Sequence, residues 1–157
     1  MEALEQLLVK SAIVLNYPAK DAEDVVTELG RCLFEAGYVR DSFVQAALER
    51  ERSLPTGLPL LGGINAAIPH TDVEHVHKPG VAFATLAEPV TFSNMVLPDE
   101  EIPVSLVFLL ALDQPKAQVE MLKQIAGVLQ NPALIEALSK ASDGEEVIDI
   151  IKNRGGD

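Results

Sequence analysis

Near the start of the chain, the spacing of the apolar residues changes from that of a strand to that of a helix. Residues 11–17 form a short β-branched run that ends at Pro18, which predicts a strand. After Asp21, apolar residues recur at intervals of three and four as far as Gly37. This periodicity predicts an amphipathic helix with Asp21 as its N-cap and Gly37 as its C-terminal stop.

The next segment carries a second helical pattern and then loses its periodicity. Ser42 and Gln45 have the spacing of a capping box, and the apolar stripe after them predicts a helix as far as Glu51. Residues 54–65 are rich in glycine and proline and show no usable period, so we expect a loop there.

The middle of the chain contains short apolar segments separated by turn residues, and each of these segments predicts a strand. Two of the segments are almost continuously apolar, which is typical of strands that helices cover on both faces. The expected strands are residues 66–70, 81–86, 90–92 and 103–112.

Helical patterns return in the last third of the chain. We expect helices over residues 115–129, 131–138 and 145–152, the last of them opened by a capping box of Ser142 and Glu145. Strands that lie between two helical ends predict an α/β fold. The expected architecture is a single three-layer α/β/α sandwich with a central mixed β-sheet flanked by helices, formed by one domain over residues 1–157.

The composition fits a folded domain and argues against two classes of partner. Of the 157 residues, 48% are apolar and 23% are charged, which is enough for a full core. Twelve basic residues against 24 acidic ones give a net charge of −12. Because nucleic acids and anionic membranes attract basic surfaces, neither is an expected partner.

The cysteine content and the apolar runs indicate a cytoplasmic protein. Cys32 is the single cysteine, which excludes a disulfide framework, and its place beside an apolar helical stripe predicts a core position. The first five residues lack the basic start of a signal peptide. The apolar run at residues 102–112 is too short for a membrane-spanning helix, so direct membrane insertion is not expected.

The three histidines of the chain lie in one short segment, as His70, His75 and His77. Two or three of them, with Asp72 or Glu74, could bind a metal ion and support a metal-dependent hydrolase. For His75 and His77, the favoured interpretation is that of solvated residues in an extended loop. His70 differs because it ends a short apolar strand, where α/β folds place reactive groups. The residues alone leave these alternatives open.

Four stretches of sequence carry a family resemblance. Residues 50–57 read RERSLPTG, residues 63–70 read GINAAIPH, residues 84–90 read ATLAEPV and residues 104–112 read VSLVFLLAL. In this order and spacing, the chain resembles enzyme IIA of the bacterial phosphoenolpyruvate-dependent sugar phosphotransferase system, in its fructose/mannitol class. The resemblance covers nearly the whole chain and implies a phosphotransferase with a phosphohistidine intermediate.

The resemblance also implies roles for individual residues. His70 would carry the phosphoryl group and Arg50 would stabilise it, which suits a guanidinium that stays charged and binds two oxygens at once. At the position of a second histidine of the family, this chain has Gln118. In this departure from the family pattern, the chain is similar to the galactitol-specific subgroup. In the first turn of its helix, the Gln118 amide could donate to the phosphoryl group or to the imidazole, or merely cap buried backbone.

Thr56 and Gly57 lie in the glycine-rich segment before the strand of His70. Their backbone N–H groups and the Thr56 hydroxyl could bind the phosphoryl group, or the glycines could simply form turns. By resemblance, the donor would be the phosphocarrier protein HPr and the acceptor an enzyme IIB with a reactive cysteine, with a membrane IIC acting indirectly. The alternative is a regulatory EIIA-like module whose phosphorylation state is read by partners. No cofactor or metal is expected.

Overall fold

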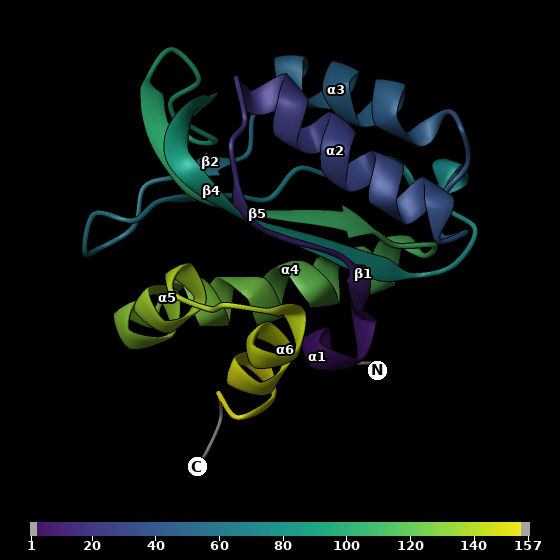
Figure 1. The fold of residues 1–157 in the computed structure, drawn as a ribbon. Helices are drawn as coiled ribbons and strands as arrows, with labels where there is room; N and C mark the ends of the chain where they lie inside the picture. The colour runs from purple at the N-terminus through teal and green to yellow at the C-terminus, as the bar shows by residue number, and fades with distance from the viewer. Residues whose placement is uncertain (1–2, 155–157) are drawn as a thin grey trace.

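A mixed five-stranded sheet forms the middle of the molecule (Figure 1). The computed structural model describes residues 3–154, and the strands lie in the order β1-β4-β5-β3-β2. The β1–β4 and β3–β5 pairs are parallel, whereas the β4–β5 and β2–β3 pairs are antiparallel. The strands are β1 (Leu8–Tyr17), β2 (Gly57–Leu58), β3 (Ala66–Ala67), β4 (Gly80–Ser93) and β5 (Glu101–Ala111).

Helices cover both faces of this sheet. Helices α2 (Ala22–Glu35) and α3 (Phe43–Ser53) lie on one face, and α1 (Leu4–Leu7), α4 (Pro115–Leu129), α5 (Pro132–Ser139) and α6 (Gly144–Lys152) lie on the other (Figure 1). Along β5, Val107 and Leu109 belong to the core under α2, whereas Phe108 and Leu110 belong to the core over α4. The predicted three-layer α/β/α sandwich with a mixed sheet is therefore confirmed.

Helix α2 begins and ends as its sequence predicts. The Asp21 carboxylate accepts a hydrogen bond from the backbone N–H of Asp24 at 2.9 Å, and Gly37 follows the helix with φ of +85°. Helix α3 starts where expected but without the predicted capping box, because Ser42 makes no cap hydrogen bond. The Ser42 hydroxyl instead lies 2.8 Å from Nδ1 of His75, a contact between distant segments that local spacing does not reveal.

Three further predictions needed correction. Residues 81–86 and 90–92 belong to one long strand, β4, whose register shifts between Thr85 and Val90 instead of ending there. The expected loop at residues 54–65 contains β2, which pairs with β3. At α6 the N-cap is Asp143, and the Ser142 hydroxyl donates to the Glu146 carboxylate.

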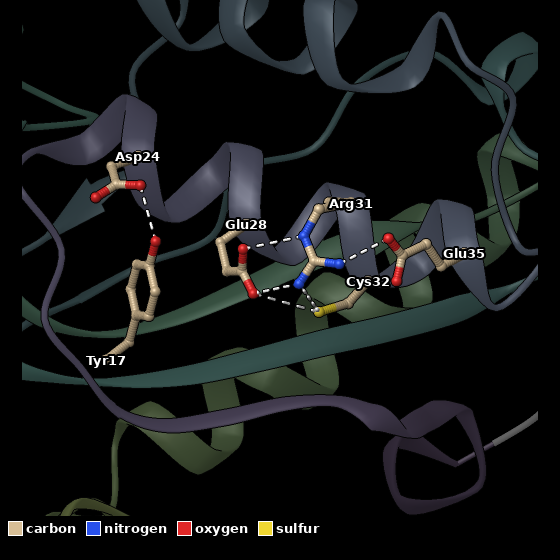
Figure 2. Close-up of polar contacts among 6 residues, drawn as sticks. All are labelled: Tyr17, Asp24, Glu28, Arg31, Cys32 and Glu35. Atoms are coloured by element: carbon tan, nitrogen blue, oxygen red, sulfur yellow. Dashed lines mark hydrogen bonds and ion pairs between the residues drawn. The ribbon is translucent and has the colours of Figure 1, made fainter.

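Cys32 lies at the edge of the core and not inside it. Figure 2 shows its thiol on α2 beside Glu28 and Arg31, with Sγ 3.9 Å from Glu28 Oε2. Burial and this carboxylate raise the pKa of the Cys32 thiol. Within residues 3–154, no helix is both long enough and apolar enough to cross a membrane.

Candidate functional site around His70

The topology of the sheet brings His70 and the start of α4 to the same edge. β3 runs parallel to β5, and the backbone N–H of Leu110 donates to the Pro69 carbonyl at 3.1 Å, which extends this pairing toward His70. β5 ends at Ala111, and α4 begins shortly afterwards at Pro115. The carboxyl ends of parallel strands are where α/β sheets present reactive groups, and His70 lies at such an edge.

The imidazole of His70 is held in one orientation. Its Nδ1 lies 2.9 Å from the carbonyl oxygen of Ile68, and the residue is only 8% exposed. A carbonyl oxygen can only accept a hydrogen bond, so Nδ1 carries the proton and donates it. Nε2 therefore keeps a free lone pair, which is the nucleophilic form of the ring.

The surroundings of His70 keep its ring neutral. Burial lowers the pKa of His70 below its usual range, and the positive charge of Arg50 acts in the same direction. The Ile68 carbonyl and the Asp72 carboxylate raise the pKa but do not overcome burial. At neutral pH the imidazole is thus unprotonated at Nε2 and able to attack phosphorus.

Arg50 lies in the last turn of α3 and lines an open groove together with Thr71 and Asp72. Its Nη1 is 3.8 Å from Asp72 Oδ1, too far for a hydrogen bond. Its Nε is buried and has no hydrogen-bond partner among residues 3–154. A buried N–H without an acceptor is costly, and an arriving phosphoryl oxygen could satisfy it.

Gln118 occupies the first turn of α4 and is partly buried. Its Oε1 is buried and, in the part of the chain that the structure describes, has no hydrogen-bond partner. The Gln118 oxygen therefore accepts no backbone N–H from the described residues. Rotation of the amide exchanges its oxygen and nitrogen, so the same position can present a donor to an anion.

Thr56 and Gly57 are tightly packed next to the strand that leads to His70. The backbone N–H and the hydroxyl of Thr56 both donate to the Glu51 carboxylate at 2.8 Å. A Cβ atom at Gly57 would lie 2.6 Å from the Ser93 carbonyl oxygen, so this glycine permits a close approach of backbones. In this geometry both residues position the strand of His70, and their predicted contact with a phosphoryl group stays a prediction.

Two carboxylates of the site have roles that the sequence does not indicate. Glu51 is visible along the chain only as the second residue of the Arg-Glu pair, and its bonds to Thr56 arise from the turn after α3. Asp72, a candidate metal ligand by sequence, has its carboxylate 3.8 Å from the Arg50 guanidinium instead.

The other two histidines have surroundings different from those of His70, although His75 lines the same groove as Arg50. His75 ends a turn of 3₁₀ helix, η1 (Val73–His75), instead of lying in extended chain, and its ring contacts Ser42. His77 is exposed. Among the described residues, no group of three or more His, Cys, Asp and Glu side chains is close enough together to hold a metal ion.

Comparison with known proteins places this site in a family. The family model described as "Phosphoenolpyruvate-dependent sugar phosphotransferase system, EIIA 2" matches residues 6–154. The galactitol-specific EIIA component of Escherichia coli K12 is 31% identical over 118 residues, which cover 75% of this chain and 77% of that protein.

Two solved structures share the fold over almost their whole length. A putative PTS IIA (PtxA) from Streptococcus mutans has a TM-score of 0.80 and 25% identity, covering 97% of this chain and 94% of that one. The Escherichia coli complex of IIAMtl with phosphorylated IIBMtl gives a TM-score of 0.74 and 29% identity, covering 94% of this chain and 98% of the matched chain. The chain therefore belongs to the EIIA type 2 family of the sugar phosphotransferase system, whose members are phosphotransferases that pass phosphoryl groups by way of a histidine.

Proposed function

We propose that His70 accepts a phosphoryl group from phospho-HPr and passes it to the cysteine of a cognate enzyme IIB. The observation that carries this proposal is the hydrogen bond from His70 Nδ1 to Ile68, which leaves Nε2 as the nucleophile. The protein acts in the cytoplasm as one domain. It acts on the membrane component IIC only indirectly, by way of IIB. Similarity to a galactitol-specific component supports galactitol or a related polyol as the sugar taken up.

The transfer step follows from the form of the ring. The Nε2 lone pair attacks phosphorus, the bond between phosphorus and the donor breaks, and its electron pair stays with the donor. The His70 ring becomes positively charged, and the Nδ1–H bond to the Ile68 carbonyl stabilises that charge. Attack of an IIB thiolate on the same phosphorus then returns the electron pair to Nε2 and restores the neutral ring. The known complex of a related IIA with phosphorylated IIB supports this acceptor.

Arg50 and Gln118 stabilise the group in transit. Charge spreads over the phosphoryl oxygens in the transition state, and fixed donors lower its energy. We assign the unpartnered Arg50 Nε and the Gln118 amide to these oxygens. The long 3.8 Å separation of Arg50 and Asp72 lets the guanidinium turn toward the phosphoryl group without breaking a hydrogen bond. Thr56 and Gly57 hold the strand beneath the phosphoryl group.

The test is phosphoryl transfer in a defined mixture. The protein is incubated with phosphoenolpyruvate, enzyme I and HPr, and its intact mass is measured. We expect one acid-labile phosphoryl group on the parent protein and on a His75→Gln/His77→Gln variant, and none on His70→Gln. A label that persists on His70→Gln contradicts the assignment.

A panel of IIB proteins separates transport from regulation. A transport component passes its label to one cognate IIB within seconds and supports phosphorylation of a polyol. A regulatory module accepts the label but passes it to none of them, which would overturn the transport proposal while leaving His70 as the acceptor.

A further inference from the structure

A chain of hydrogen bonds connects α3 to the ring of His70. Glu51 Oε1 and Oε2 each lie 2.8 Å from a donor of Thr56. The backbone N–H of Ile68 donates to Thr56, with Oγ1 at 3.2 Å and the carbonyl oxygen at 3.3 Å. The carbonyl of Ile68 in turn accepts from His70 Nδ1 at 2.9 Å.

We propose that Glu51 is a positioning residue, which acts through Thr56 and Ile68 to hold the His70 imidazole in its reactive orientation and in register with Arg50. This inference rests on the proposed function, in which Nε2 of His70 is the nucleophile. Glu51 does not touch the phosphoryl group or the ring itself.

The geometry of Thr56 explains why a carboxylate is suited to this position. Its hydroxyl donates to Glu51 and accepts from Ile68, so both of its roles are used and its rotamer is fixed. A carboxylate has two oxygens and can take both Thr56 donors at once. With Thr56 fixed, the Ile68 backbone is fixed, and so is the direction of the carbonyl that selects the tautomer of His70.

The link transmits position and not a proton. The N–H and the C=O of Ile68 belong to two different peptide planes, so no proton can pass through this residue from Thr56 to His70. The hydrogen bonds instead fix the position of the backbone at Ile68, which leads to His70. An error of about 1 Å at a reacting atom costs on the order of a hundredfold in rate, so this placement matters for transfer.

Glu51 and Arg50 are neighbours on α3 but face different cavities. Arg50 lines the groove with Asp72, whereas Glu51 lines a cleft between α2, α3 and β4 whose apolar walls include Val26 and Phe92. The other charged groups of that cleft are Arg52 and Glu23, and they pair with each other at 3.2 Å. One helix turn thus carries both the proposed phosphoryl ligand and the anchor for the strand of the nucleophile.

The energetics agree with a positioning role. Burial raises the pKa of Glu51 to about 7, although its hydrogen bonds from Thr56 act in the opposite direction. An apolar side chain in the same cleft would avoid that desolvation. The two hydrogen bonds from Thr56 are thus kept although Glu51 is desolvated.

The experiment compares variants that break the link with variants that preserve it. Glu51→Met keeps the length of the side chain and suits the apolar walls, and Thr56→Val removes the hydroxyl. Thr56→Ser keeps the hydroxyl, and Glu136→Met removes an exposed glutamate on the opposite side of the sheet. The readouts are the ¹⁵N chemical shifts of the His70 ring, the rate of phosphoryl acceptance from phospho-HPr, and the thermal unfolding midpoint.

We expect Glu51→Met and Thr56→Val to shift the ring nitrogens of His70 toward a mixture of tautomers and to lower the transfer rate about tenfold. The double variant should lose no more than the worse single variant, because both changes break one link. Thr56→Ser should keep the ring shifts of the parent protein, and Glu136→Met should match the parent in all three readouts.

Unchanged ring shifts in folded Glu51→Met and Thr56→Val overturn the proposal, even if the unfolding midpoint falls, since that result shows a purely structural role. If Glu51→Met does not fold, the ring shifts of Thr56→Val against those of Thr56→Ser decide between the two roles. The ring shifts are measured without any phosphoryl donor, so failure of this inference is distinct from failure of His70 as the acceptor.

Discussion

The polar groups on the outer face of α2 are paired with one another, whereas buried polar atoms at the edge around His70 lack partners among the described residues. On α2, the Arg31 guanidinium lies between Glu28 and Glu35 at 2.6 and 2.7 Å, and the Tyr17 hydroxyl donates to Asp24 at 2.8 Å (Figure 2). Burial and the Asp24 carboxylate raise the pKa of Tyr17 to about 12, so its proton stays in that hydrogen bond.

The edge around His70 instead contains buried polar atoms that a ligand could still bind. Among residues 3–154, Arg50 Nε and Gln118 Oε1 are buried without partners, and burial lowers the pKa of His70. Satisfied polar groups stabilise a fold, whereas unsatisfied ones cost free energy until a ligand arrives. The difference indicates that the polar contacts on α2 stabilise the fold, whereas the unpartnered atoms at the His70 edge are suited to bind an incoming anion. Substitutions in the two regions should therefore separate stability from transfer.

The largest effect should come from Arg50→Met. Loss of the guanidinium removes a fixed donor from the transition state, so the rate of phosphoryl acceptance should fall about 10²- to 10³-fold. The free energy of unfolding should change little, because the buried Nε has no partner to lose among residues 3–154. Quench-flow kinetics and urea unfolding measure the two quantities. Arg31→Met is the matched control, and a comparable loss of rate there would break the comparison.

Gln118→Leu should have the next largest effect. We expect about a tenfold slower transfer, the scale of one lost hydrogen bond to a charged group. Stability should equal or exceed that of the parent protein, since the change removes a buried oxygen that has no partner in the described part of the chain. A clear drop in the urea midpoint together with an unchanged rate would show that Gln118 is structural.

The lowered pKa of His70 predicts a pH dependence of stability. The unfolded chain binds a proton near pH 6.5, whereas the folded chain resists it, so stability falls as the pH drops below that value. The slope from one group is at most about 1.4 kcal/mol per pH unit. Glu51 acts with the opposite sign, because its raised pKa removes stability as the pH rises from 4.5 to about 7.

The contribution of His70 is isolated by subtraction. Urea unfolding of the parent protein and of His70→Gln is compared from about pH 8 to pH 5, so that Glu51 cancels. The stability of the parent relative to the variant should decline toward low pH. A difference that stays constant would mean that His70 is not desolvated.

The smallest effect should come from Tyr17→Phe. Loss of the hydrogen bond to Asp24 should lower the free energy of unfolding by about 1 kcal/mol and leave the transfer rate at its parent value. A slower transfer in this variant would show that the two regions are coupled.

Local sequence signals predicted the helices well and the pairings of the site poorly. Asp21, Gly37 and the period between them define α2 from neighbouring residues alone. The two-residue strand β2 has no period to detect, because its pairing partner β3 and the β4–β5 turn decide that it is a strand.

In the candidate site, too, local motifs reveal some residues, whereas contacts between distant segments stay hidden. The sequence singled out His70, Arg50 and Gln118 because family motifs lie along the chain. It did not reveal that Glu51 reaches the ring through Thr56 and Ile68, since that link closes only when the two segments fold together. The contact of Ser42 with His75, 33 residues away, was hidden for the same reason.

The most direct test of the proposed mechanism is to locate the phosphoryl group on the ring. Two-dimensional ¹H–¹⁵N NMR of the protein, phosphorylated by phosphoenolpyruvate, enzyme I and HPr, distinguishes the two nitrogens of each histidine. We predict a phosphorylated Nε2 on His70, with Nδ1 still protonated and bonded to Ile68. Phosphorylation at Nδ1 of His70, or on His75 or His77, would contradict the mechanism.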